Sequence, residues 1–272
     1  MAVTEAVTDA LVRVRDATFR YGQREILSQV SLDVHRGEIV SVLGPNGCGK
    51  TTLLRCIAGA LPLDGGSIAI GDLDVHALAP PARARRIGFL FQDHTPSFPF
   101  TAGDVVLMGR APHLGFLGFP GHRDAALADA ALDRFGLLHV KDRPYTRLSG
   151  GERQLVLLAR IVAQKPDVIL LDEPTAHLDV RNQVSTLRMV RSLAADGMAM
   201  IMTTHDPNHA LWFGGRAALM KSGRLVAVGA ARDVMTESAL TSVYGVDVAV
   251  LTQRSRTGGD RVVCSPWLPD RD

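Results

Sequence analysis

The sequence predicts an α/β fold whose core is a parallel sheet. Three short apolar runs, at 39–43, 168–171 and 198–202, have the length and continuous hydrophobicity of strands buried on both faces. The first two runs are each followed by a stretch with helical spacing of apolar residues, at 52–58 and from about 180. Strand, helix, strand, helix and strand in this order imply parallel pairing through right-handed crossovers.

The elements before and after the first buried run indicate a second, antiparallel sheet. Residues 12–14 and 26–34 alternate as half-buried antiparallel strands do, and further strand-like pieces follow at 67–70 and 87–91. The last piece leads into Gln92. Tyr21 lies between the first two strands, and taken alone it is more readily a core aromatic than a ligand-binding one.

A change of composition marks an inserted helical subdomain at about 94–165. Proline, glycine and aromatic residues are frequent up to Pro120, and residues 127–135 then present one apolar helix face. Ser149 and Glu152 have the spacing of a capping box that starts another helix, which ends before Lys165. We therefore expect a single domain over residues 10–251 with this insertion, followed by a polar tail at 252–272.

Composition excludes several classes of protein. The chain has 272 residues, of which 46% are hydrophobic and 21% charged, so it can form a sizeable core. The net charge of +2 is too balanced for a general nucleic-acid or membrane-surface binder. No apolar run approaches the roughly 18–20 residues of a membrane helix. Three cysteines without metal-ligand spacing favour a reducing cytoplasm.

Residues Gly44–Thr51, Gly-Pro-Asn-Gly-Cys-Gly-Lys-Thr, match the phosphate-binding pattern G-x-x-x-x-G-K-[ST] between a strand and a helix. The glycines let backbone N–H groups converge on one anion, and the helix N-terminus adds partial positive charge. Lys50 would reach the β- and γ-phosphates, and Thr51 would bind Mg²⁺. A chance match arises on the order of once per hundred chains of this size. The strand-loop-helix context therefore indicates a nucleotide site.

Two further strand ends carry polar residues that belong with this loop. Asp172 and Glu173 follow the second buried run, and His205 follows the third. Because ligands bind beyond the carboxyl ends of parallel strands, all three clusters should meet at one edge. Asp172 would hold Mg²⁺ through water and Glu173 would polarise an attacking water, whereas a lone strand-ending acid would more simply cap a turn.

Ser149, Gly150 and Gly151 form a second candidate anion site, since a hydroxyl and exposed amides gather at a helix N-terminus. One chain would then have two phosphate-binding surfaces but only one full nucleotide cradle. This arrangement points to a dimer in which the second surface of each chain closes over the nucleotide of its partner.

Together these motifs, in this order, resemble the nucleotide-binding subunit of ATP-binding cassette (ABC) transporters over residues 10–250. The resemblance implies a P-loop NTPase cassette with a RecA-like parallel-sheet core, an N-terminal antiparallel β-subdomain and the inserted helical subdomain, acting as an ATPase with ATP and Mg²⁺. It implies adenine stacking for Tyr21, a catalytic glutamate in Glu173, a switch histidine in His205, and a Q-loop glutamine in Gln92 that touches Mg²⁺ and water. Asp172 is the implied metal-binding aspartate and Asp179 the D-loop residue, although His177 replaces the usual D-loop serine. The remaining implied nucleotide contacts are Asn46, Gly47, Cys48, Gly49 and Thr52, besides Gly44, Lys50 and Thr51, with Ser149, Gly150 and Gly151 from the partner chain.

Several members of the superfamily fit the sequence poorly. The stretch between Lys50 and Ser149 is too short for the coiled coil of DNA-repair ATPases and shows no heptads. Translation-factor ATPases carry two cassettes, fused exporters carry membrane helices, and sugar-importer ATPases usually append a regulatory domain. A single-cassette transporter subunit remains.

The segments Pro99–Thr101 and Met108–His113 resemble the helical-subdomain sequence of importers of metal chelates. These importers are the iron–siderophore, haem and cobalamin systems, and they have molybdate-type relatives. The resemblance implies a homodimer on the cytoplasmic face of the inner (cell) membrane, peripheral, with a periplasmic or extracellular solute-binding protein as indirect partner and no nucleic acid. An iron–siderophore-like cargo is expected. The alternatives are molybdate, haem or cobalamin, or a soluble ABC-type ATPase that acts on a macromolecular partner.

The same resemblance places a transmembrane permease near Gln92 and residues Phe98–Phe119. The candidate apolar residues divide evenly between a docking groove and the core of the small subdomain: Phe98, Phe100, Leu114, Phe116, Leu117 and Phe119. An exposed apolar patch of several hundred Å² would favour docking.

Overall fold

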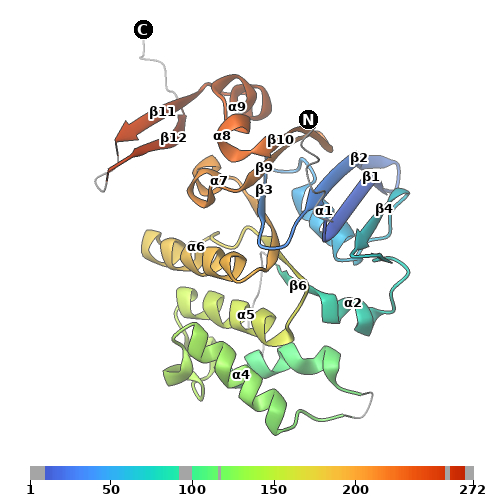
Figure 1. The fold of residues 1–272 in the computed structure, drawn as a ribbon, viewed down its shortest axis with the longest axis vertical. Helices are drawn as coiled ribbons and strands as arrows, with labels where there is room; N and C mark the ends of the chain where they lie inside the picture. Colours follow the sequence, from blue (N-terminus) through green and yellow to red (C-terminus); the bar gives the residue numbers. More distant parts are fainter. Residues whose placement is uncertain (1–9, 92–99, 116–117, 255–257, 267–272) are drawn as a thin grey trace, which may run out of the picture.

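The computed structural model describes residues 10–91, 100–115, 118–254 and 258–266. The described residues form a mixed α/β structure, as the sequence predicts. Figure 1 shows an antiparallel sheet on one side of a central parallel sheet and a group of helices on the other. Gln92, Phe98, Phe116 and Leu117 lie outside the described residues.

The central sheet has the strand order β10-β9-β3-β8-β7-β6, in which all neighbours are parallel except β9 and β10. Its strands are β3 (Ile39–Leu43), β6 (Ile87–Leu90), β7 (Val168–Asp172), β8 (Ala199–Thr204), β9 (Arg216–Lys221) and β10 (Arg224–Ala230). The three apolar runs of the sequence are β3, β7 and β8, and every residue in them is buried. Their registers pair Leu43 with Thr204 and Asp172 with Thr203, so their carboxyl ends meet at one edge.

The N-terminal sheet is antiparallel, with the order β2-β1-β4-β5. Its strands are β1 (Val12–Tyr21), β2 (Arg24–Val34), β4 (Gly65–Ile70) and β5 (Leu73–Asp74). Strand β1 continues through residues 19–21, which the sequence pattern leaves between strands. Tyr21 therefore pairs with Arg24 across the turn that joins β1 to β2.

The helices include α1, which starts at Lys50 directly after the glycine-rich loop, and α5 and α6, which follow Ser149 and Asp179 as N-caps. The α-helices are α1 (Lys50–Ile57), α2 (Pro80–Arg86), α3 (Ala102–Leu107), α4 (His122–Arg134), α5 (Gly150–Gln164), α6 (Val180–Ala195), α7 (Pro207–Phe213), α8 (Ala231–Val234) and α9 (Glu237–Tyr244). Short 3₁₀ helices are η1 (Met108–His113), η2 (Leu138–Val140) and η3 (Tyr145–Arg147).

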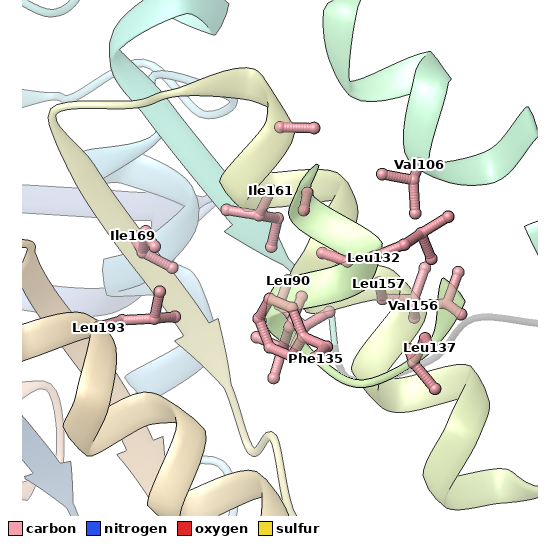
Figure 2. Packing of buried hydrophobic residues seen from close by; sticks show 14 of the residues in the cluster. Leu90, Val106, Leu132, Phe135, Leu137, Val156, Leu157, Ile161, Ile169 and Leu193 are labelled. Carbon is pink, nitrogen blue, oxygen red and sulfur yellow. The ribbon is translucent and has the colours of Figure 1, made fainter. Parts of the chain in front are cut away.

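The helical subdomain shares one hydrophobic core with the central sheet. Leu132 and Phe135 of the α4 region lie against Val156 and Leu157 of α5 in this cluster (Figure 2). The same cluster continues through Ile169 of β7 and further sheet residues. Helix α5 therefore joins the two parts, and its N-terminus at Ser149 is held by packing as well as by its cap.

The C-terminal segment differs from the expected polar tail. Strand β11 (Val248–Arg254) pairs with β12 (Asp260–Pro266) in a two-stranded antiparallel sheet, so the boundary at residue 251 falls inside a strand. The polar side chains of this hairpin face solvent, whereas Cys264 is buried against the cluster formed by α7, α8 and α9. One buried face is enough to fix a hairpin whose composition is otherwise that of a tail.

Candidate functional site

A cavity of about 850 Å³ lies beyond the carboxyl ends of β3, β7 and β8. Strand ends, the loop before α1 and the first hairpin all contribute side chains to it. Its lining residues are Tyr21, Arg24, Ile26, Asn46, Gly47, Gly49, Lys50, Thr51, Thr52, Glu173, Ala176, His177 and His205. The structure thus gathers most of the sequence-predicted site in one place.

The glycine-rich loop is shaped to hold an anion. Gly49 has a φ of 112°, and a Cβ there would lie 3.0 Å from the carbonyl oxygen of Ile26, so a side chain is excluded by conformation and by space. Lys50 is only 6% exposed, and its Nζ donates to the carbonyl oxygens of Gly44 and Pro45 at 2.8 and 3.3 Å. Its ammonium group is therefore held at the loop that would receive phosphates.

Asp172 and Thr51 form the part of the site suited to a metal. Asp172 is 3% exposed, and its Oδ1 accepts hydrogen bonds from Thr51 Oγ1 at 3.1 Å and Thr203 Oγ1 at 2.7 Å. Both Thr51 and Asp172 offer the hard oxygen ligands that Mg²⁺ prefers. The described residues contain no group of three or more His, Cys, Asp or Glu side chains able to hold a metal ion. This limited donor set fits Mg²⁺, which is usually bound by one or two protein groups together with substrate phosphates.

Glu173 lies between two basic side chains. Its Oε1 is 4.0 Å from Lys50 Nζ, and its Oε2 is 3.4 Å from His205 Nδ1. The backbone N–H of Glu173 donates to Thr203 Oγ1 at 2.9 Å. Glu173 also has a φ of 46°, a conformation that costs on the order of 1–3 kcal/mol for a residue with a side chain. The end of β7 therefore turns this carboxylate into the cavity at an energetic cost.

Tyr21 and His205 are two exposed members of the set. Tyr21 is 48% exposed and its ring meets Phe19 edge to face at 4.8 Å, so it is not the core residue that its position alone suggests. The side chain of His205 is 61% exposed, and its contact with Glu173 orients the ring toward the cavity.

Sequence reasoning missed Thr203, Arg24 and Ile26. Thr203 bonds to both Asp172 and Glu173. The sequence offered a signal for this residue, because it stands at the end of β8, which the parallel register pairs with Asp172. Arg24 and Ile26 line the cavity because β2 starts beside Tyr21. That placement depends on a strand pairing that no local pattern specifies.

The second anion surface does not reach this cavity in one chain. Ser149, Gly150, Gly151 and Asp179 are not among its lining residues. Ser149 caps α5, where its Oγ accepts from the N–H of Glu152 at 3.3 Å and donates to Glu152 Oε2 at 2.8 Å. These contacts with Ser149, the bond from its backbone N–H foremost, lower the pKa of Glu152 below its ordinary value.

Asn182, which the sequence did not single out, connects this surface to Asp179. Its backbone and side-chain amides donate to Asp179 at 2.8 and 3.0 Å. A Cβ on Gly151 would lie 2.2 Å from Asn182 Oδ1, so a side chain there would require the Asn182 amide to shift. Ser149 and Gly150 are exposed beside this contact.

Gly44 and Cys48 do not line the main cavity either. A second cavity, of about 330 Å³, is lined by Cys48 together with Lys221 and Ser222. Burial raises the pKa of the Cys48 thiol above its usual value. Gln92 cannot be placed, because it lies outside the described residues.

Known proteins similar to this chain agree with the site. The cobalamin import ATP-binding protein BtuD of Halobacterium salinarum is 42% identical over 247 residues, and the match spans 90% of this chain but only 61% of that protein. The hemin import ATP-binding protein HmuV of Thermobifida fusca is 40% identical over 238 residues, covering 88% of this chain and 83% of that protein. A solved structure assigned to the metal-chelate type of ABC transporter, in an inward-facing conformation, superposes with a TM-score of 0.86 at 31% identity, covering 96% of this chain and 99% of that one.

A search of the described helices finds none that is long and apolar enough to cross a membrane. The family model for ABC transporters matches residues 27–176, more than half of the chain, from within β2 to beyond Glu173. With the glycine-rich cradle and the acidic end of β7 inside that range, the chain belongs to the ABC transporter family.

Proposed function

We propose that this chain is the ATP-hydrolysing subunit of an importer that takes up a metal chelate through a separate permease. The cavity that is lined by Lys50, Thr51 and Glu173, with the buried Asp172 bonded to Thr51, supports the ATPase. The similarity to proteins named for hemin and cobalamin import, and to a metal-chelate type transporter, supports the class of cargo. An iron–siderophore cargo is the expectation from sequence, and the names of the relatives support two of its stated alternatives, hemin and cobalamin.

ATP binding would use three parts of the cavity. Tyr21 presents an exposed ring on which adenine stacks, a contact worth roughly 1–3 kcal/mol per base. The loop amides surround the phosphates, and Lys50 exchanges the carbonyl oxygens of Gly44 and Pro45 for phosphate oxygens. Thr51 and Asp172 would hold Mg²⁺, which when bound offsets the negative charge of the phosphates.

Hydrolysis would depend on Glu173. Its carboxylate accepts the proton of the water that attacks the γ-phosphate, in line with the leaving ADP oxygen. Thr203 fixes the backbone of Glu173, and His205 contacts its Oε2 from the opposite side to Lys50. His205 is thereby placed to sense the γ-phosphate and the glutamate together.

Two chains would complete each site. Ser149 and Gly150 are exposed at the N-terminus of α5 yet absent from their own chain's cavity, which is the arrangement expected when they bind the partner's ATP. The dimer is then head to tail and symmetric, with two ATP molecules at its interface.

A permease would dock on the exposed apolar side chains of the helical subdomain. Phe119 is 90% and Phe100 45% exposed, and Leu114 is half-buried, so none of the three described candidates is core. The subunit would then lie at the cytoplasmic face of the cell membrane, held there by the permease.

The catalytic role is tested with Glu173→Gln, which keeps the size of the side chain and removes its basicity. We expect ATP binding to persist and the hydrolysis rate to fall by about 10²–10⁴-fold. Glu25→Gln is the matched control, because Glu25 is exposed, contacts Ser28 and Arg20, and does not line the main cavity. Turnover within a factor of a few of the wild type would remove Glu173 as the base.

The transport role is tested by uptake of hemin, cobalamin and an iron–siderophore in a strain that lacks the gene. Complementation by the wild type but not by Glu173→Gln, for one of the three solutes, supports the proposal. Activity stimulated by a macromolecule, with no defect in uptake of any chelate, would instead favour a soluble ATPase of another class.

A further inference from the structure

The hairpin β11–β12 is bonded to the segment that carries His205. The side-chain amide of Asn208 in α7 accepts from the N–H of Cys264 at 2.8 Å and donates to the carbonyl oxygen of Cys264 at 3.1 Å. It thus pairs with both backbone groups of one residue of β12, 56 positions away. Asn208, which makes both bonds, lies only three residues after His205 in the sequence.

The same asparagine belongs to a compact set of bonds on both sides of His205. Its backbone and side-chain amides donate to Asp206 Oδ1 at 2.8 and 3.0 Å. The N–H of Asp206 donates to Thr204 Oγ1 at 3.1 Å, and that hydroxyl also contacts Nδ1 of the buried His209 at 3.0 Å. These bonds therefore fix the residues before and after His205. Through Asn208 they connect this loop to Cys264.

A second contact reaches His205 from the helix that precedes the hairpin. The hydroxyl oxygen of Tyr244 lies 3.5 Å from the carbonyl oxygen of His205. An apolar cavity of about 330 Å³ is lined by His205, Tyr244 and Cys264 together. The C-terminal elements thus form the wall behind the histidine loop, on the side away from Glu173.

We propose that Asn208 is a positioning residue for His205 and that the hairpin β11–β12 is the support through which it acts. This inference rests on the proposed role of His205 in ATP hydrolysis. An exposed imidazole on a short loop reaches Glu173 only if the loop is fixed, and a displacement of about 1 Å can cost about 10²-fold in rate. The expected effect is therefore on turnover more than on nucleotide affinity.

A merely structural role makes a different prediction. The hairpin also packs Cys264 into the cluster of α7, α8 and α9, so losing its bonds would lower the melting temperature. A structural effect would not depend on which residue stands at position 205. The two roles are therefore separated by a double-mutant cycle.

The experiment compares Asn208→Ala, His205→Ala and the double variant in the full chain. We expect Asn208→Ala to lower kcat by at least about 10-fold, while the dissociation constant for ATP changes less than about 2-fold. In the His205→Ala background the same change should have no further effect on kcat. Ser265→Ala is the control, because this neighbour of Cys264 has an exposed side chain whose hydroxyl donates to the carbonyl oxygen of the adjacent Pro266, so the variant should keep wild-type kcat.

Asn208→Asp serves the same cycle if Asn208→Ala does not fold, since it keeps the acceptor for the Cys264 N–H and removes the donor. A fall in kcat by the same factor in both backgrounds, or an unchanged kcat with a lower melting temperature, would overturn the inference. An unchanged kcat in His205→Ala alone would overturn the role of His205 itself, which is a separate failure.

Discussion

At the residue scale, Thr203 makes the contacts that join the metal-binding and catalytic carboxylates. One hydroxyl donates to Asp172 and accepts from the N–H of Glu173, and it is fully buried. Its position follows from the register that pairs it with Asp172, so it holds β7 and β8 together at the edge where chemistry occurs.

Replacing this hydroxyl provides a sharp prediction. Thr203→Val keeps the shape but removes both bonds, and we expect it to lower the free energy of unfolding by about 1–3 kcal/mol because buried polar groups lose their partner. Hydrolysis should fall as well, since Glu173 loses its backbone anchor. Denaturant titration and kcat measure the two effects. Thr203→Ser, which keeps the hydroxyl, should stay near the wild type, and equal losses in both variants would contradict this account.

His209 predicts a dependence of stability on pH. Burial, partly opposed by Asp206, lowers its pKa below the ordinary 6.5, so the folded protein keeps it neutral. Between that lowered pKa and about 6.5 the unfolded chain binds more protons than the folded one, so stability is complete above this window and decreases as pH falls through it. We expect the melting temperature to drop between pH 7.5 and 5.5, and the drop to be smaller in His209→Asn.

Control for this prediction comes from His139, an exposed residue of η2. His139→Asn should leave the slope of melting temperature against pH unchanged. The lowered pKa values of Asp124 and Glu152 act only at more acidic pH, near and below the usual carboxyl range, so they do not produce this drop. A wild-type slope in His209→Asn would show that another group is responsible.

The sequence predicts residues whose role follows from their place at a strand end. Lys50, Asp172, Glu173 and His205 were found in this way, because parallel strands end at one edge. Thr203 and Asn208 were missed because their partners are 31 and 56 residues away and neither belongs to a local motif. Tyr21 shows the same limit, because its exposure depends on the pairing of β1 with β2.

At the element scale, the packing of α4 on α5 decides how firmly the helical subdomain is held. Leu132 is fully buried between these helices and belongs to the cluster that continues into β7 (Figure 2). Because the cluster is continuous, the subdomain and the central sheet should unfold together. A second cluster joins the central sheet to the N-terminal sheet and α1, and a third joins it to α7, α8 and α9.

Truncating this side chain tests that cohesion. Leu132→Ala should lower the free energy of unfolding by about 2–5 kcal/mol, from lost burial and the cavity that remains. The transition should stay single when followed by circular dichroism and by ATP binding. Leu138→Ala is the matched control, because Leu138 is 47% exposed. Two separate transitions in Leu132→Ala would show that the subdomain is an independent unit.

The hairpin β11–β12 was not predicted from the sequence, and the reason is physical. The strands β3, β7 and β8 are buried throughout, so their sequence is continuous and apolar. The hairpin β11–β12 buries little more than Cys264 and part of β11, and its remaining residues are as polar as a tail. Burial, which makes a strand recognisable in sequence, is what this hairpin lacks.

At the scale of the whole molecule, the proposed dimer would divide each nucleotide site between two surfaces, one from each chain. The cavity is lined by the cradle and Glu173, while Ser149 and Gly150 are exposed at the N-terminus of α5, outside the cavity lining. Helix α5 fixes the second surface to the core, and Asn182 fixes it to Asp179. Two copies related by a two-fold axis would bring each surface to the other's cavity.

Mixed dimers test this arrangement directly. Lys50→Ala removes the cradle's cation and Ser149→Arg blocks the second surface, so each homodimer should be inactive because each of its two sites has one defect. A mixed dimer places both defects in one site and leaves the other intact. With free exchange about half of the dimers are mixed, and activity should therefore return to about a quarter of the wild type.

The control is a mixture of Lys50→Ala with the double variant Lys50→Ala/Ser149→Arg, in which no intact cradle exists and no activity should return. Restored activity only in the first mixture shows that the cradle of one chain works with the Ser149 of another. Full activity of the Ser149→Arg homodimer, or of an isolated monomer, would show instead that one chain holds a complete site. In that case the exposure of Ser149 and Gly150 outside the cavity would need a different explanation, because a site complete in one chain has no use for a second phosphate-binding surface beyond its reach.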